Sequence, residues 1–252
     1  MNIITAAAIA FSFLTVIPVP QPEWRPSRLR LFPLMFPLVG LVVGILGGGL
    51  FLLLSRSAMT PLLQAVLLCL FYLAVTGGLH MDGFMDTCDA VFSRQPLEKR
   101  LEILTDTHVG AFAVMGCIAI LLLKTGIFYE LVDSPPSLLV LILFPVFSRL
   151  GLAALFYTLP PARKEGLAHF LGENIERAHL FVFIALFLSL SSLLLVAEGY
   201  PRLLLPAVSF SFLFLYVHFC RKTFGGITGD LMGTYLEVSE LLMLATIAAL
   251  RR

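Results

Sequence analysis

Three aspartates on one short segment are the residues of this chain best suited to chemistry. Asp82, Asp86 and Asp89 belong to Gly77-Gly-Leu-His-Met-Asp-Gly-Phe-Met-Asp-Thr-Cys-Asp89, which ends a long apolar run. Intervals of four and three residues place them within a wedge of about 60° on an α-helix. At a membrane boundary three like charges repel and lose hydration, so they require a cation or basic partners. Their oxygens predict Mg²⁺ held beside substrate phosphates.

A second helix has to complete this site, because Asp82 and Asp89 would lie about 10 Å apart along the helix axis. Asp230, Thr234 and Glu237 repeat the same four-then-three spacing near the end of the chain. The repeat predicts a second acidic face, with Asp230 and Glu237 as further metal ligands. The simpler interpretation is an interhelical turn with a solvated acidic cap.

The segment before this second face is rich in glycine and preceded by two basic residues. Glycines let the backbone approach a ligand closely, and successive amides there can cradle phosphate oxygens. The basic side chains would add charge-assisted hydrogen bonds. The predicted phosphate-binding residues are Arg221, Lys222, Gly225, Gly226, Thr228 and Gly229.

Further polar residues extend the list of candidates. Asp106 follows a short stretch with an apolar stripe, which predicts an interfacial helix that folds Asp106 back toward Asp82 and Asp86. On a continuous helix His80 would point about 160° away from Asp82, so it joins the site only if the helix ends or bends near Gly83.

Three basic residues lie in less obvious places. Arg149 stands inside an apolar run and predicts either a buried counter-ion for an aspartate or a phosphate clamp. Arg163 belongs to a charged loop and is a further candidate for phosphate binding. Lys124 is nearer a segment end, where snorkelling to the membrane surface would explain it without a function.

The composition places these residues in a membrane protein. Of 252 residues 59% are hydrophobic and only 13% are charged, about half the usual charged fraction. A net charge of +1 gives no indication of nucleic-acid binding, and the four scattered cysteines indicate no disulfide framework or zinc site. We expect one membrane-embedded catalytic domain over residues 1–252.

Repeated apolar runs predict an all-α polytopic bundle of about 7–8 transmembrane or re-entrant segments. The first and last runs are short for a span. The loops between these runs differ in their number of basic residues. Alternate loops, which would lie on one side of the membrane, hold eleven Lys and Arg, and those on the other side hold four. This bias predicts that the aspartate motif and the glycine-rich segment face the cytoplasm from the cytoplasmic membrane. The runs fall near residues 2–18, 33–54, 61–80, 109–131, 137–158, 179–197, 202–219 and 236–250.

Taken together, the motifs resemble the cobalamin synthase family of adenosylcobinamide-GDP ribazoletransferases. The resemblance covers nearly the whole chain and rests on four segments, which are Phe13-Leu-Thr-Val-Ile-Pro-Val-Pro20, the motif at 77–89, Ala162-Arg-Lys-Glu-Gly-Leu167 and Gly225-Gly-Ile-Thr-Gly-Asp230.

The resemblance implies a Mg²⁺-dependent membrane enzyme. A hydroxyl of α-ribazole, or of its 5′-phosphate, would attack the phosphorus attached to cobinamide in adenosylcobinamide-GDP, and GMP would leave. Asp82 and Asp86 would be the first metal ligands, with Asp89 or Asp106 as a further ligand or base. Membrane lipid would surround the protein, and a homo-oligomer is compatible with the sequence. The family's usual basic residue before Asp106 is Thr105 here, and a usual glycine is Ala113.

Two other functions compete with this one. A CDP-alcohol type of lipid phosphotransferase also uses an aspartate-rich helix, but the Ala-Arg pair expected after its Asp-Gly is absent here. A cation transporter would line a path through the midplane with its carboxylates, whereas these cluster at one face, and no inverted repeat is visible.

Overall fold

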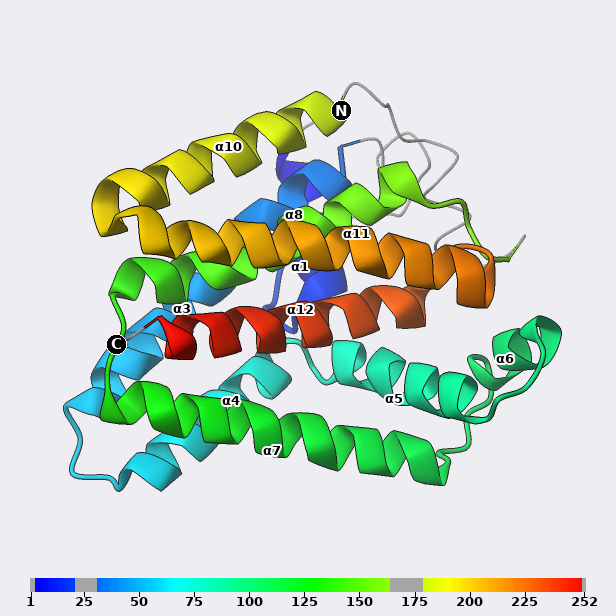
Figure 1. Ribbon diagram of the computed structural model, residues 1–252, viewed down its shortest axis with the longest axis horizontal. Helices are drawn as coiled ribbons and strands as arrows, with labels where there is room; N and C mark the ends of the chain where they lie inside the picture. Colours follow the sequence, from blue (N-terminus) through cyan, green and yellow to red (C-terminus); the bar gives the residue numbers. More distant parts are fainter. Residues whose placement is uncertain (1–2, 21–30, 164–178, 251–252) are drawn as a thin grey trace.

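The computed structural model describes residues 3–20, 31–163 and 179–250 as a bundle of helices (Figure 1). Within these ranges no strand forms, and one isolated bridge joins Pro161 to Ile227. The predicted all-α fold is confirmed. The helices and two 3-10 turns are α1 Ile3–Leu14, η1 Pro33–Met35, α3 Phe36–Ser55, α4 Pro61–Val75, α5 Leu79–Phe92, α6 Leu97–Ile103, α7 Ala111–Asp133, α8 Leu138–Thr158, α10 His179–Glu198, η2 Tyr200–Leu203, α11 Leu204–Phe224 and α12 Gly229–Ala249.

Six of the described helices are long and apolar enough to cross a membrane, and the bent pair α4–α5 would make a seventh span. This count agrees with the sequence prediction of seven to eight segments. The first apolar run forms only the 12-residue helix α1, as its length predicted.

The span that carries the aspartates is broken. Its two halves, α4 and α5, meet at an angle of 90°. The chain turns at Gly77 and Gly78, whose φ angles of 64° and 75° belong to the left-handed region that favours glycine. A new helix therefore begins at Leu79, and the aspartates follow its N-terminus rather than the end of a long continuous helix.

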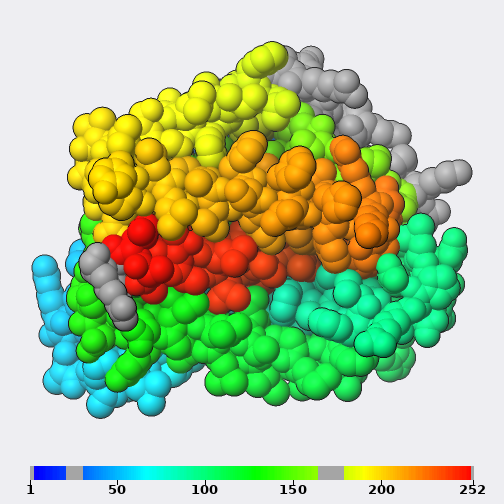
Figure 2. All heavy atoms as spheres, in the orientation of Figure 1, coloured from blue at the N-terminus to red at the C-terminus, as the bar shows by residue number. Residues whose placement is uncertain are grey.

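Helix α12 lies at the centre of the bundle, between α11 and α7 in the view of Figure 1, and it packs against α5, α7, α8 and α11. In the space-filling view only a strip of α12 reaches the surface between its neighbours (Figure 2). The prediction that the last segment is short was wrong, because α12 runs for 21 residues. Its polar residues lower its hydropathy, but most of them find partners inside the bundle, as described below.

The polar loops meet at one end of the bundle. The Arg100 side chain donates a hydrogen bond to the Thr223 carbonyl across 3.2 Å, and the Ile227 amide donates to Pro160 across 2.9 Å. The short helix predicted here is present as α6, and Leu104 at its end is buried. The aspartate motif and the glycine-rich segment therefore lie at the same end of the bundle.

Small residues allow close contact between helices α3 and α8. A Cβ on Gly44 would collide with the Ile142 carbonyl, and one on Gly48 would lie 2.8 Å from the Leu138 side chain. Gly49, by contrast, meets nothing within 4 Å.

Single cysteines should report the shared side directly. In a background without native cysteines, Gln95→Cys and Thr223→Cys should react alike with an impermeant thiol reagent in intact cells, because their loops are in contact. Ala58→Cys, in the loop at the other end of the bundle, should show the opposite accessibility. Different labelling of Gln95→Cys and Thr223→Cys would contradict this topology.

Candidate active site

The site is built where α5 crosses α12 at very short range. A Cβ on Gly83 would lie 2.8 Å from the Asp230 backbone, and one on Gly233 would lie 2.8 Å from the His80 carbonyl. Small residues thus let two membrane helices approach until their backbones touch. No packing role was predicted for Gly83 or Gly233, although each is the small residue beside an acidic motif.

Two threonines lock this crossing. The Thr234 Oγ1 lies 2.7 Å from the Thr87 Oγ1 and 3.1 Å from the Gly83 carbonyl. The Thr87 hydroxyl also donates to the Gly83 carbonyl across 2.8 Å. All of these groups are buried, so the hydrogen bonds fix the rotation of both helices and the direction of the aspartates on them.

The crossing brings together carboxylates that are far apart in the sequence. Asp86 lies within electrostatic range of Asp82, Asp89 and Asp230. Arg163 is the basic residue within range of Asp230, and its Nη2 donates to the Leu101 carbonyl across 2.5 Å. Helix α12 therefore brings Asp230 close to the aspartates of α5, while its predicted role as a metal ligand stays a prediction.

A cavity of about 140 Å³ opens beside this cluster. Asp82 and Asp230 line it, and the first turns of both α5 and α12 face it. Helix N-termini favour anions, whereas the aspartates in them favour cations. The cavity is therefore suited to bind an anion together with a cation, such as a phosphate group and the metal ion bound to it. Its wall consists of Phe13, Leu14, Leu79, His80, Gly83, Leu152, Gly229, Met232, Gly233 and Leu236.

His80 joins this site in a way that the sequence did not predict. The helix neither ends nor bends near Gly83; it starts at Leu79, so His80 and Asp82 both stand in its first turn and both line the cavity. One ring nitrogen of His80 is hydrogen bonded to the Leu14 backbone. Its Nε2 is buried and finds no partner in the described part of the chain. That nitrogen is the polar atom of His80 left without a hydrogen bond beside the cavity.

Asp89 makes contacts within the protein instead of the predicted contact with a metal ion or the reacting groups. Its two carboxylate oxygens accept hydrogen bonds from the Gly110 amide at 2.7 Å and the Ala113 amide at 2.9 Å. These amides belong to the N-terminus of α7, where an acceptor from another helix satisfies donors that have no intrahelical partner. Asp89 thus anchors α7 to α5. The Ala113 departure from the family pattern leaves this backbone contact intact.

Asp106 is not brought to the other aspartates. It is exposed, and its Oδ1 accepts hydrogen bonds from the His108 amide at 3.0 Å and from the His108 ring at 2.6 Å. These hydrogen bonds hold the pKa of Asp106 below its usual value. The charged neighbours of Asp106 are His108 and Lys99 rather than the carboxylates of α5.

Glu237 belongs to a separate ion-pair network instead of the predicted metal site. It lies 2.5 Å from the Lys124 Nζ, and Lys124 lies 3.6 Å from Glu240. Arg149 pairs with Glu240 as well. All four side chains are at most 6% exposed, so two positive and two negative charges balance one another inside the bundle.

This network corrects three predictions. Lys124 does not snorkel to the surface, because Glu237 neutralises it in the interior. Arg149 is a buried counter-ion, but its partner is Glu240 rather than an aspartate. With 1% exposure it has no access to a phosphate in this structure. The four-then-three repeat was misleading because its members do not share one site. Asp230 lines the cavity, whereas Glu237, beyond Thr234 on the same helix, belongs to the buried ion-pair network.

The glycine-rich segment divides by role. Gly225 ends α11 with φ 74°, and a Cβ on Gly226 would collide with the Pro160 carbonyl, so both serve the turn. Thr228 caps α12 by accepting from the Leu231 amide. Of these three glycines only Gly229 lines the cavity, and a Cβ there would meet nothing within 4 Å.

The basic pair before these glycines lies outside the cavity lining. Arg221 donates to the Thr158 carbonyl across 2.6 Å, and Lys222 is exposed.

Within the described ranges, no three His, Cys, Asp or Glu side chains are already arranged as a set that could hold a metal ion. The donor set still suits one. Asp82, Asp86 and Asp230 offer hard oxygen ligands, and Mg²⁺ commonly takes only one or two carboxylates together with water and substrate phosphates.

Fold and site together define a polytopic membrane protein with a cavity, next to two helix N-termini, that is lined by two aspartates and a histidine. The comparisons with known proteins agree. The family described as "Cobalamin-5-phosphate synthase" matches residues 6–248, and the chain belongs to it. Family membership makes the chain a transferase. No solved structure matches it.

Several curated relatives are similar over nearly their whole length, and each is named adenosylcobinamide-GDP ribazoletransferase. The relative from Desulfitobacterium hafniense (strain Y51) is 37% identical over 94% of this chain and 93% of its own. That from Geobacillus thermodenitrificans (strain NG80-2) is 35% identical over 93% and 92%. That from Clostridium botulinum (strain Alaska E43 / Type E3) is 32% identical over 95% of both.

The helix crossing predicts a sharp effect of one methyl group. Gly83→Ala should push α12 away from α5 and destabilise the protein by about 1–3 kcal/mol, as overpacking does. Gly126→Ala, on α7, meets nothing within 4 Å and should leave stability unchanged or slightly raised. Thermal unfolding in detergent compares the two variants. Equal melting temperatures would show that the crossing is not tightly packed.

The ion-pair network predicts that Glu237 is not a metal ligand. Lys124→Met alone should destabilise the protein by about 3–5 kcal/mol, because it leaves a buried carboxylate without its partner. The double variant Lys124→Met/Glu237→Met should recover most of that stability. It should also keep the wild-type Mg²⁺ concentration for half-maximal activity. A raised Mg²⁺ requirement in the double variant would restore Glu237 as a ligand.

Proposed function

We propose that this protein is an adenosylcobinamide-GDP ribazoletransferase. It joins adenosylcobinamide-GDP to α-ribazole, or to α-ribazole 5′-phosphate, and releases GMP. The observation that carries the proposal is the meeting of Asp82 and Asp230 at one cavity, with Asp86 in electrostatic range of both, in a chain that matches the family over residues 6–248. Family membership favours this substrate over that of a CDP-alcohol phosphotransferase.

The reaction is a displacement at phosphorus. The ribazole hydroxyl oxygen forms a new bond to the phosphorus attached to cobinamide, and the bond from that phosphorus to the bridging oxygen breaks. GMP departs with the bridging oxygen. In reactions of this kind, catalysis consists mainly of positioning and of stabilising the charge on the phosphoryl oxygens.

The residues at the cavity supply these functions in the proposed mechanism. The first turn of α12 and Arg163 favour the diphosphate through the helix dipole and a positive charge. The open space at Gly229 lets a phosphate approach the backbone. The unpartnered Nε2 of His80 accepts the proton of the attacking hydroxyl, because its other nitrogen is already held by Leu14.

Mg²⁺ is the proposed cofactor, with Asp82, Asp86 and Asp230 as its protein ligands. When bound, the ion would neutralise charge on the diphosphate. The clustering of these aspartates supports the proposal, since three adjacent carboxylates are unfavourable without a compensating cation. Asp89 holds the α5 segment in place by capping α7, and Asp106 stays outside the ligand set.

The proposed location is the cytoplasmic membrane, with the cavity open toward the cytoplasm. The excess of Lys and Arg in alternate loops of the sequence supports the orientation. Both small-molecule substrates would then reach the site from the cytoplasm while the bundle stays in lipid.

The direct test combines purified protein with adenosylcobinamide-GDP, α-ribazole and Mg²⁺, and measures GMP release and cobalamin formation. Asp82→Asn and Asp86→Asn should each lower kcat by about 10²-fold or more, on the scale of removing one group that stabilises transition-state charge. Asp106→Asn is the matched control and should stay near the wild-type kcat. Normal turnover in both α5 variants would overturn the site, and no GMP release by the wild-type protein would overturn the proposed function.

A pair of glycine variants separates ligand contact from packing. Gly229→Ala should fold normally, since its Cβ meets nothing within 4 Å, and should weaken binding of adenosylcobinamide-GDP by about tenfold, or 1.4 kcal/mol. Gly226→Ala should instead lose stability through its collision with Pro160, while its folded fraction binds normally. Equilibrium binding and thermal unfolding measure both effects. Wild-type affinity in Gly229→Ala would remove this turn from the phosphate site.

A further inference from the structure

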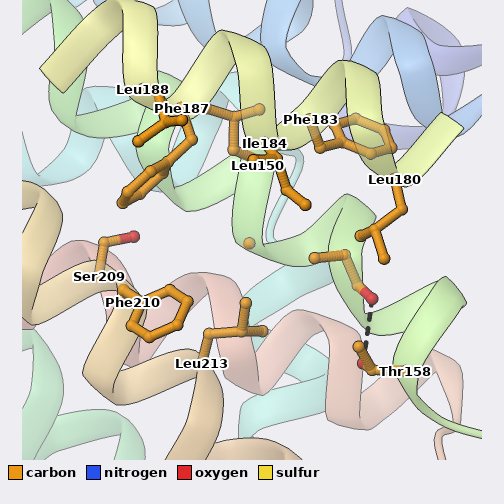
Figure 3. Close-up of a pocket in the computed structure, with 12 residues that line it drawn as sticks. Leu150, Thr158, Leu180, Phe183, Ile184, Phe187, Leu188, Ser209, Phe210 and Leu213 are labelled. Carbon is orange, nitrogen blue, oxygen red and sulfur yellow. Dashed lines mark hydrogen bonds between the residues drawn. The ribbon is translucent and has the colours of Figure 1, made fainter. Parts of the chain in front are cut away.

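A second and larger cavity lies outside the proposed active site. It forms a groove of about 490 Å³ between α8, α10 and α11, within the range of roughly 300–1,000 Å³ typical of small-molecule sites. In Figure 3, side chains of α10 form one wall and side chains of α11 form the other. Apart from the hydroxyls of Thr158 and Ser209, the side chains that line it are apolar.

The two ends of the groove differ in the residues around them. At one end the Phe187 ring lies 5.6 Å from that of Phe147 and 6.3 Å from that of Phe210. Thr158 lies at the opposite end (Figure 3), and there the Arg221 guanidinium binds the Thr158 carbonyl. An apolar channel thus leads to an exposed positive charge.

The length of the groove fits one leaflet of a membrane. Its lining runs along α10 from Leu180 to Leu188, which is about 12 Å of helix. Half of a hydrocarbon core of about 30 Å is about 15 Å. All three helices are long and apolar enough to span the membrane, and much of α10 is exposed outside the groove, for example at Phe181 and Val182.

We propose that this groove binds one anionic phospholipid, with an acyl chain between α10 and α11 and its phosphate at Arg221. Hydrocarbon is the chemistry that an apolar groove at membrane depth accepts, because water there would face almost no hydrogen-bonding group. The guanidinium supplies the preference for a negative headgroup. The lipid would occupy the leaflet on the side of the aspartate cluster. This role accounts for the position of Arg221 at Thr158, outside the cavity that holds the aspartates.

The test uses protein reconstituted in equal parts of phosphatidylglycerol and phosphatidylcholine, extracted into mild detergent and examined by native mass spectrometry. The wild-type protein should retain one lipid, with phosphatidylglycerol enriched about tenfold, or 1.4 kcal/mol. Leu213→Trp fills the groove and should lose that lipid. Leu215→Trp makes the same exchange on an exposed part of α11 outside the groove lining and should retain it. Arg221→Gln should retain a lipid without the preference for phosphatidylglycerol.

A second matched pair guards against misfolding. Ile184→Trp fills the groove from α10, whereas Val182→Trp lies outside its lining, and the melting temperature checks that each variant folds. Equal lipid retention within either folded pair would overturn the proposal, as would an unchanged headgroup preference in Arg221→Gln. Displacement of the lipid by adenosylcobinamide-GDP, or conversion of a dimer to monomers by Leu213→Trp alone, would assign the groove to the substrate or to a second copy instead.

Discussion

The contact of the α5 and α12 backbones at Gly83 and Gly233 is the constraint on which the site depends. Without a side chain at either position, the two helices approach until the carbonyl of one meets the Cα of the other, and the Thr87–Thr234 hydrogen bond fixes their rotation. This places Asp82 and Asp230 at one cavity, with Asp86 in electrostatic range of both. The approach forces like charges together, which is unfavourable unless a cation compensates them. The packing of two helices thereby creates the requirement that the proposed metal would meet.

A second polar layer sustains this arrangement from deeper in the bundle. Lys124 and Arg149 reach α12 from α7 and α8, and Glu237 and Glu240 neutralise them there. Removing one member would leave a buried charge, so the network opposes any sliding of α12 against its neighbours. The same helix therefore carries Asp230 of the proposed site at its start, and the buried ion pairs of Glu237 and Glu240 in its middle. Activity and stability of α12 are separable along its length for that reason.

Much of this could be predicted from the sequence, and the errors have physical causes. Apolar runs and loop charges predicted the helices and the shared side of the loops, because membrane helices must be long and apolar. The axial separation of Asp82 and Asp89 predicted that a second helix takes part in the site, and the acidic residue Asp230 pointed to which one. Spacing could not reveal partners, however. Glu237 pairs with Lys124, Asp89 caps α7 and Asp106 binds His108, and each contact joins residues whose relation only the fold decides. The positive φ angles at Gly77 and Gly78 also restart the helix, which brings His80 to the cavity.

We propose that Asp82 and Asp230, on different helices, bind one metal ion. A double-mutant cycle on the dissociation constant of Mn²⁺, used as a paramagnetic substitute for Mg²⁺ and measured by electron paramagnetic resonance, tests this sharing. Asp82→Asn and Asp230→Asn should each weaken Mn²⁺ binding strongly. The double variant should be little weaker than either single one, with a coupling of about 0.5–3 kcal/mol between the two positions. Independent, additive losses, or unchanged Mn²⁺ affinity in Asp230→Asn, would contradict a shared site.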